Sequence, residues 1–268
     1  MWYVNVAVTR VFDVLLWPFR GWPTGGLVFV SALTGVLMLL IFKFTSQQGR
    51  VRQSKNVVRA HLLAMRLFAD DVGVVMSSQK AALRANLSYL RWAALPILFI
   101  FPPVILIMSQ LNLRYGAEPV PVGGTTVVTA TFEDAVDPDV RLSAPPGVRV
   151  ETEACRVPYL REASWRVKGL KPGEYTLSVV SGGRGYEKEF VVGEGAPGHV
   201  SPERPRSVWG QLWHPGEPPV PGPLERVRLN YAPAKVSVWR FEMSWVWMFF
   251  IVSLAAAMAF KGVLKAEI

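Results

Sequence analysis

The sequence contains one cysteine, Cys155, and only three histidines among its 268 residues. A single cysteine excludes an internal disulfide framework and leaves no cysteine–histidine cluster for a metal ion. No paired carboxylates, and no nucleophile with a base and an orienting group, stand out either, so we expect neither an enzyme nor a bound metal or cofactor. His199 and His214 lie in a proline-rich stretch, which we interpret as a connector.

Charged side chains are absent from three long runs. Residues 21–42 and 92–113 are each 22 residues without Asp, Glu, Lys or Arg, and residues 243–260 add a third run of 18. At about 1.5 Å rise per residue, helices of this length suit the roughly 30 Å of bilayer hydrocarbon. The sequence therefore predicts three transmembrane helices.

The charges that are present predict the orientation of these spans. Residues 43–91 hold nine Lys or Arg against two Asp, so we expect this segment, like the tail 261–268, in the cytoplasm. Residues 114–241 carry 16 basic and 15 acidic residues and are expected outside, as is the N-terminus. Positive charge beside the spans favours membrane lipids over DNA as a partner. We expect an integral protein of a bacterial inner membrane.

The first 20 residues are rich in Trp, Val, Leu and Phe, and their polar residues Asn5, Thr9 and Asp13 recur at every fourth position. This spacing places the three side chains on one narrow stripe of a helix. We favour an amphipathic helix over 1–20 that lies in the outer membrane interface and is ended by Pro18 and the turn that follows. A fourth span is the alternative.

Apolar residues of the segment 43–91 recur at helical spacing on both sides of a break at 69–73. The pattern predicts a helical hairpin whose arms pair through their apolar stripes, like a short coiled coil. Its basic side chains either only solvate the outside or, with the adaptable methionines, bind a hydrophobic segment, a nascent chain or the RNA of the ribosome. The candidate partner-binding residues are Arg59, Met65, Arg66, Met76, Arg84 and Arg91.

Prolines and small polar residues mark the predicted spans. Pro96 and the pair Pro102 and Pro103 remove backbone donors, so we expect the second span to be kinked. Polar side chains at membrane depth either pack between helices or face a wet cavity. The candidates for lining a groove are Ser31, Thr34, Ser109, Gln110, Asn112 and Ser253.

The external region alternates apolar and polar residues between glycine and proline turns, which is typical of β-strands. The predicted strands are 125–132, 139–143, 148–153, 163–167, 174–180 and 187–192, with closing strands at 226–231 and 235–239. We expect a β-sandwich over 114–194, similar to immunoglobulin-like domains of bacterial envelope proteins, a Pro/Gly-rich connector over 195–223, and the closing strands within 224–241. The predicted fold class is thus an α-helical membrane protein with three transmembrane helices, a cytoplasmic helical hairpin and an extracytoplasmic all-β immunoglobulin-like sandwich.

This order of parts resembles the core of the Oxa/YidC superfamily of membrane-protein insertases, including its minimal three-span members. The matching segments are residues 25–42, 45–91, 92–113 and 244–260, and the match is one of architecture without a residue signature. The resemblance implies a hydrophilic groove open to the cytoplasm and to lipid, lined here by Ser31, Thr34 and Ser253. It also implies that nascent membrane proteins are partners.

Three functions remain open from the sequence. An insertase-like protein would aid membrane-protein insertion or assembly through the basic hairpin and a polar intramembrane groove. A non-catalytic envelope scaffold or complex subunit would bind an envelope protein through its external β-domain. A transporter subunit or signalling protein is the third. A polar groove would favour the first function, whereas dry helix packing with an exposed apolar patch on the β-domain would favour the second.

Overall fold

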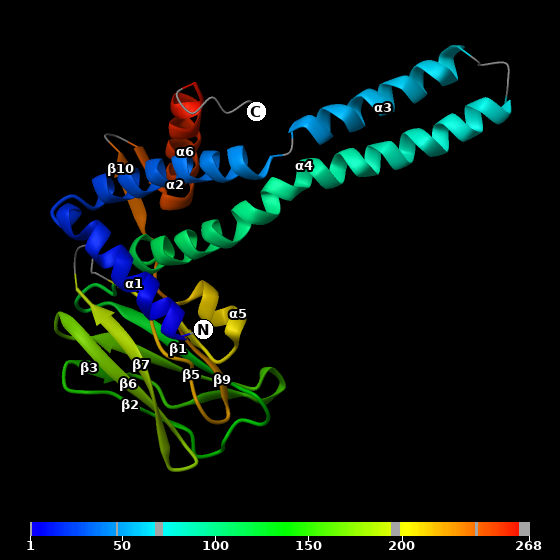
Figure 1. Cartoon of the computed structure of the whole chain (residues 1–268). Coiled ribbons are helices and arrows are strands. Elements are labelled where there is room, and N and C mark those ends of the chain that lie inside the picture. Colours follow the sequence, from blue (N-terminus) through cyan, green and yellow to red (C-terminus); the bar gives the residue numbers. More distant parts are fainter. Residues whose placement is uncertain (1, 47, 68–71, 194–198, 239–240, 263–268) are drawn as a thin grey trace. The chain divides into compact units, whose positions relative to one another are not determined.

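The computed structural model describes residues 2–46, 48–67, 72–193, 199–238 and 241–262. The chain forms two compact units, of which the first comprises Met1–Val30 and Ile105–Phe250. The second comprises Ser31–Val104 and Ile251–Ile268. The helices are α1 (Trp2–Leu16), α2 (Pro23–Thr45), α3 (Gln48–Leu67), α4 (Val72–Tyr115), α5 (Val208–Trp213) and α6 (Trp245–Lys261), with 3₁₀ turns η1 (Trp17–Phe19) and η2 (Pro158–Leu160) (Figure 1).

Two helices are long and apolar enough to cross a membrane, namely α2 and the part of α4 from Val75 to Tyr115. They contain the predicted spans 21–42 and 92–113 except for residues 21 and 22. The third predicted span, 243–260, falls largely in α6, which is apolar but shorter, with 17 residues. Within the described residues, two helices therefore meet the criterion of length and composition for a membrane span.

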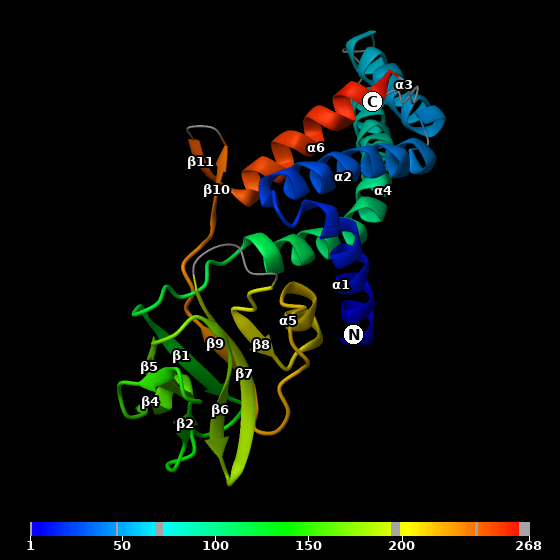
Figure 2. The ribbon, with the colours of Figure 1, turned by 90° about the vertical axis from the view of Figure 1, so that its left-hand side faces the viewer.

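The first unit contains two antiparallel β-sheets packed around one apolar core, as the alternating sequence predicts. The strands are β1 (Thr125–Phe132), β2 (Arg141–Ser143), β3 (Val148–Val150), β4 (Cys155–Val157), β5 (Glu162–Gly169), β6 (Gly173–Ser181), β7 (Arg184–Val192), β8 (Glu203–Pro205) and β9 (Leu224–Leu229). One sheet has the order β3-β5-β1-β9-β8, with β4 also paired to β5, and the other has the order β2-β6-β7. A separate ribbon pairs β10 (Lys235–Val238) with β11 (Phe241–Ser244) (Figure 2).

The core between the two sheets is formed by the side chains that point inward from the strands. Phe132, Trp165, Leu177, Phe190 and Leu229 are all buried there. Each fully buried side chain of this size contributes about 1.5–3 kcal/mol relative to exposure, so the core accounts for much of this unit's stability. The second sheet turns at Gly182 and Gly183, whose φ angles of 55° and 74° belong to the left-handed region that two-residue hairpins of this type require.

The structure differs from the sequence prediction in one part of this unit. The stretch 195–223, predicted as a connector, contains strand β8 and helix α5, and β8 pairs with β9 at the edge of the larger sheet. The turn between β5 and β6 carries the chain from one sheet to the other, because these two strands have different partners. A proline-rich segment can form a short strand at a sheet edge, such as β8, which ends at Pro205. The backbone N–H that proline lacks is not needed on the side of an edge strand that has no neighbouring strand.

The second unit contains most of α2, α3, the first part of α4 and the end of α6. Helix α4 continues through Pro96, Pro102 and Pro103 as a single element. Helix α3 and the first part of α4 run in opposite directions as a hairpin (Figure 1). Residues 68–71 of the predicted break lie outside the described residues.

The arms of the hairpin do not bury their apolar stripes against each other as predicted. Leu62, Met76, Leu83, Leu87 and Leu90 are all more than half exposed. Met76, Leu83, Leu87 and Leu90 share one face of α4 by their spacing, and the structure leaves this face open because periodicity gives the phase of an apolar stripe but not the partner that covers it. The hairpin therefore presents apolar side chains as well as its basic ones.

Candidate functional site

A cluster of five polar side chains in the first unit joins α1, the end of α4 and the chain before β8. Its members are Thr9, Asp13, Gln110, Arg114 and His199. Only Gln110 among them was a predicted site residue. The cluster is the densest set of polar contacts between sequence-distant residues in the helical part of this unit, so we take it as the candidate functional site.

Arg114 is the centre of the cluster, with a side chain that is 7% exposed. Its guanidinium donates to Asp13 Oδ1 at 2.5 Å, to Gln110 Oε1 at 2.8 Å and to the backbone oxygen of Thr9 at 3.2 Å. The guanidinium also lies 5.7 Å from the ring centroid of Phe12. A planar cation with five donors suits a partly buried position surrounded by oxygens, because a lysine could not satisfy the same fork.

His199 and Gln110 extend the cluster on either side of Arg114. His199 Nε2 lies 2.9 Å from Asp13 Oδ1, so one carboxylate contacts both the histidine and the arginine. Gln110 Nε2 donates to Thr9 Oγ1 at 3.0 Å. These contacts hold α1 against the end of α4 and against the chain before β8.

The polar stripe of α1 explains how this helix is oriented. Asn5, Thr9 and Asp13 lie on one face because they are four residues apart, and Asn5 is 2% exposed. Asn5 Nδ2 donates to the backbone oxygen of Gln211 in α5 at 2.8 Å. The polar face of α1 is thus directed to protein along most of its length.

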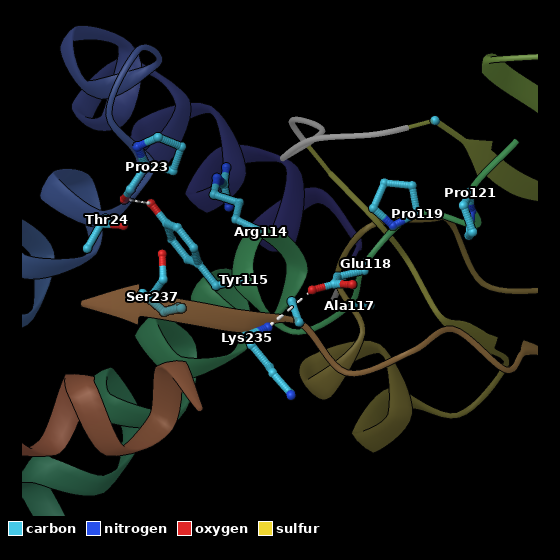
Figure 3. A pocket seen from close by; sticks show the side chains of 13 residues that line it. Pro23, Thr24, Arg114, Tyr115, Ala117, Glu118, Pro119, Pro121, Lys235 and Ser237 are labelled. Carbon is cyan, nitrogen blue, oxygen red and sulfur yellow. Dashed lines mark hydrogen bonds between the residues drawn. The ribbon is translucent and has the colours of Figure 1, made fainter. Parts of the chain in front are cut away.

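A cavity of about 480 Å³ lies beside Arg114 (Figure 3). Tyr115 donates from its hydroxyl to the backbone oxygen of Pro23 at 3.0 Å, and the Lys235 amide donates to Glu118 Oε1 at 3.4 Å. The Lys235 ammonium pairs with Glu242 outside the cavity. The lining therefore offers hydroxyl and carboxylate oxygens, and among the described residues no group of three His, Cys, Asp or Glu could hold a metal ion.

A second polar cluster lies inside the β-domain, where Lys188 of β7 and Glu217 form an ion pair with side chains 0% and 3% exposed. The ammonium also donates to the backbone oxygen of Ser201 at 2.7 Å, and Glu217 Oε2 accepts from the Glu189 amide at 3.0 Å. Burial lowers the pKa of Lys188, and the neighbouring Glu217 carboxylate opposes this shift. The pair fixes the segment after α5 onto β7.

The predicted groove residues are divided between the two units. Ser31, Thr34 and Ser253 are buried in the second unit, whereas Ser109, Gln110 and Asn112 belong to the first. Ser109 Oγ donates to the Leu106 oxygen of its own helix at 2.9 Å. Asn112 is half-buried.

Helices α2 and α6 of the second unit approach each other closely in the region of the buried hydroxyls. A Cβ added at Gly35 of α2 would lie 2.1 Å from the Ser253 backbone oxygen of α6. Ser31, one turn before Gly35, and Thr34, directly before it, are 0% and 2% exposed. Small side chains that let two backbones approach are typical of helix packing within membranes.

The predicted partner-binding residues of the hairpin are accessible. Arg59, Arg66, Arg84 and Arg91 are exposed, Met76 is half exposed and Met65 is half-buried. Arg91 lies 5.7 Å from the ring centroid of the adjacent Trp92. These residues form an open basic and apolar surface rather than a concave site.

No family model and no curated protein matches this chain. Among solved structures, the crystal structure of the S-layer protein SbsC domains 4 and 5 is similar to 31% of the chain. The match covers 50% of that structure's chain at 16% sequence identity, with a TM-score of 0.24. A likeness this low carries no argument about function.

Proposed function

We propose that this protein is a non-catalytic scaffold or complex subunit of the cell envelope. Three helices (α2, the second part of α4, and α6) anchor it in the membrane, with the hairpin in the cytoplasm. The immunoglobulin-like β-domain lies outside and binds another envelope protein. The external position follows from the charge distribution along the chain.

The observation that carries this proposal is the close contact between α2 and α6. Ser31, Thr34 and Ser253 are the hydroxyls expected to line a groove, yet all three are buried where Gly35 meets the Ser253 backbone. A groove that eases polar chains through a membrane needs hydroxyls open to water. Close packing of small residues serves anchoring instead.

Two further features suit a scaffold. The Arg114 cluster fixes α1 and the chain before β8 to the end of α4, which would hold the external domain in a defined position relative to that end. At η2 the domain exposes Tyr159 at 94%, next to the exposed Leu160. Exposed aromatic and aliphatic side chains together are typical of protein-binding surfaces.

Site-specific photo-crosslinking in the native membrane tests this function. A photoreactive residue at Tyr159 or Leu160 is expected to give one discrete crosslinked envelope protein. The same residue at Lys171, an exposed position on the turn between β5 and β6, serves as the control and is expected to give none. Equal labelling of many proteins from both positions would contradict the proposal.

The exposed leucines and methionine of the hairpin favour one second function, that of an insertase-like protein. Leu83, Leu87 and Met76, close to Arg84, could hold a hydrophobic nascent segment. Ribosome-bound nascent chains of increasing length distinguish the two functions. Crosslinks that move from the hairpin to Ser31 and Ser253 as the chain lengthens would support insertion, and their absence would favour the scaffold.

A further inference from the structure

Helix α1 buries both polar and apolar side chains, and it also exposes large apolar ones. Its polar residue Asn5 is buried, and so are Phe12 and Leu16. Its outward side chains include Tyr3 and Val14, which are 87% and 77% exposed. One side of α1, which carries Tyr3 and Val14, therefore presents apolar side chains away from the protein, and water is a poor medium for such a face.

Helix α5 continues the same kind of surface on the external domain. Trp209 is 75% exposed and Trp213 is about half exposed, while Gln211 between them is buried. The helix begins at the N-cap Ser207, whose Oγ accepts from the Gly210 amide at 3.0 Å. Two hydrogen bonds fix its orientation. Gln211 Nε2 donates to the backbone oxygen of Arg206 at 3.1 Å, and the backbone oxygen of Gln211 accepts from Asn5 Nδ2.

We propose that the outer face of α1 and the two exposed tryptophans of α5 form one surface that lies in the outer lipid interface of the membrane. The two helices lie next to each other, and Asn5 connects them directly (Figure 2). The membrane contact of the β-domain through α5 adds a lipid-binding site to the proposed scaffold. It rests on the proposed anchoring of the chain by α2 and α4.

Three properties point to lipid as the occupant of this surface. Tryptophan and tyrosine are enriched at the level of the head groups, where the ring is apolar on one side and its polar atom stays wet. The basic residues Arg10 and Arg20 are exposed beside the apolar residues, which suits anionic phosphates. At about 1.5 Å per residue, α1 is roughly 22 Å long, too short to cross the hydrocarbon but suited to lie along it.

Spin-label accessibility in the full chain tests the proposal. Cys155 is the sole cysteine and is exposed, so a Cys155→Ser background allows one label at a time. The protein is reconstituted into vesicles of phosphatidylcholine with phosphatidylglycerol, and Trp209→Cys, Trp213→Cys and Val14→Cys are labelled separately. Collision of each label with oxygen, which concentrates in lipid, is compared with collision with a water-soluble nickel chelate.

Labels in the proposed surface are expected to collide severalfold more with oxygen than with nickel. Tyr159→Cys, on η2, is expected to show the opposite ratio, and Leu98→Cys, exposed on α4, reports on the anchoring itself. If the labels at Trp209→Cys and Trp213→Cys collided mainly with nickel, while the label at Leu98→Cys still preferred oxygen, the proposed lipid surface would be overturned. The proposed anchoring by α4 would remain. Nickel accessibility at 98 as well would overturn the anchoring. Protection from both reagents at 209 and 213 would indicate contact with a second copy and would also overturn the proposal.

Discussion

The helices and the β-domain expose opposite kinds of side chain. In the β-domain, Trp165 and Phe190 lie inside, and charged residues of β7 such as Arg184 and Glu187 lie outside. In the helices, the small polar residues Ser31 and Ser253 are buried, while large apolar side chains such as Ile251 and Leu98 are more than half exposed. The same chain therefore follows two packing rules.

This difference shows what each part requires from its surroundings. A sandwich with an apolar core gains its free energy from the exclusion of water. Helices packed through small polar residues gain little from water exclusion, and they rely on close backbone contact and hydrogen bonds, as helices in lipid do. Each of the following substitutions tests one side of this comparison, beginning with the largest expected effect.

The largest effect is expected where the β-domain departs from its own rule, at the buried ion pair of Lys188 and Glu217. Glu217→Gln leaves the ammonium of Lys188 without its counter-charge inside the domain. Loss of one partner of a buried pair costs about 3–5 kcal/mol, so we expect the free energy of unfolding to fall by that amount. Urea unfolding of the β-domain, followed by tryptophan fluorescence, measures it.

The double variant Lys188→Met with Glu217→Leu is the matched control for that substitution. It replaces both charges with apolar groups of similar size, which is often neutral or stabilising. We expect it to be more stable than the single variant. A double variant as unstable as Glu217→Gln would show that the segment after α5 needs the ion pair for its position.

The second effect concerns the polar face of α1. Arg114→Met removes the donors to Asp13 and Gln110 while it keeps an apolar side chain against Phe12. Hydrogen bonds to charged groups contribute about 1.5–3 kcal/mol, so we expect α1 to detach from the end of α4. Protease cleavage at Arg10 in detergent, faster than in the parent protein, measures the detachment. Arg114→Lys keeps the charge without the fork and is expected to fall between the two.

Part of this cluster could be predicted from the sequence. The spacing of Asn5, Thr9 and Asp13 gave the stripe on α1, and Gln110 was recognised as a polar residue at the end of a span. Periodicity gives the phase of a helix but not the medium that each face meets, so the inward direction of the stripe needed the structure. His199 gave no signal, because it lies 186 residues from Asp13 in a proline-rich stretch.

The long strands β1, β5, β6 and β7 were predicted closely because alternation over eight or nine residues is a strong local signal, whereas the short strands β4, β8 and β11 were not predicted. The same alternation also placed Lys188 inward, between Tyr186 and Phe190, and this lysine on an apolar face was the available sign of a buried partner. Its partner Glu217 lies 29 residues away in an irregular segment, where no period exists to place a side chain. The exposure of the hairpin's apolar residues was missed because the spacing of a stripe does not say whether another helix covers it.

A third and smaller effect tests the rule of small residues between helices. Gly35→Ala places a methyl group against the Ser253 backbone, which cannot move as a side chain can. Overpacking of this kind costs about 1–3 kcal/mol, so we expect a lower thermal unfolding temperature of the full chain in detergent. Gly49→Ala in α3 is the control, since a Cβ there has nothing within 4 Å. Equal melting of the two variants would mean that α2 and α6 do not depend on this contact.

The smallest effect concerns the free energy required to protonate His214 within the β-domain. Burial lowers the pKa of His214 below its ordinary value of 6.5, with Glu203 opposing this and Lys188 and Arg228 adding to it. Its Nδ1 is buried and has no hydrogen-bond partner among the described residues. Above pH 6.5 the imidazole is neutral in both the folded and unfolded chain, so it adds no pH dependence there.

Below pH 6.5 the unfolded chain binds this proton before the folded chain does. The free energy of unfolding of the β-domain should then decrease by up to about 1.4 kcal/mol per pH unit, until the lower folded-state pKa is reached. His214→Asn should remove this slope, and His61→Asn on α3 should leave it unchanged. A slope that persists in His214→Asn would assign it to other groups. Its loss would show that the β-domain excludes an additional charge next to Lys188, as a domain built on an apolar core should.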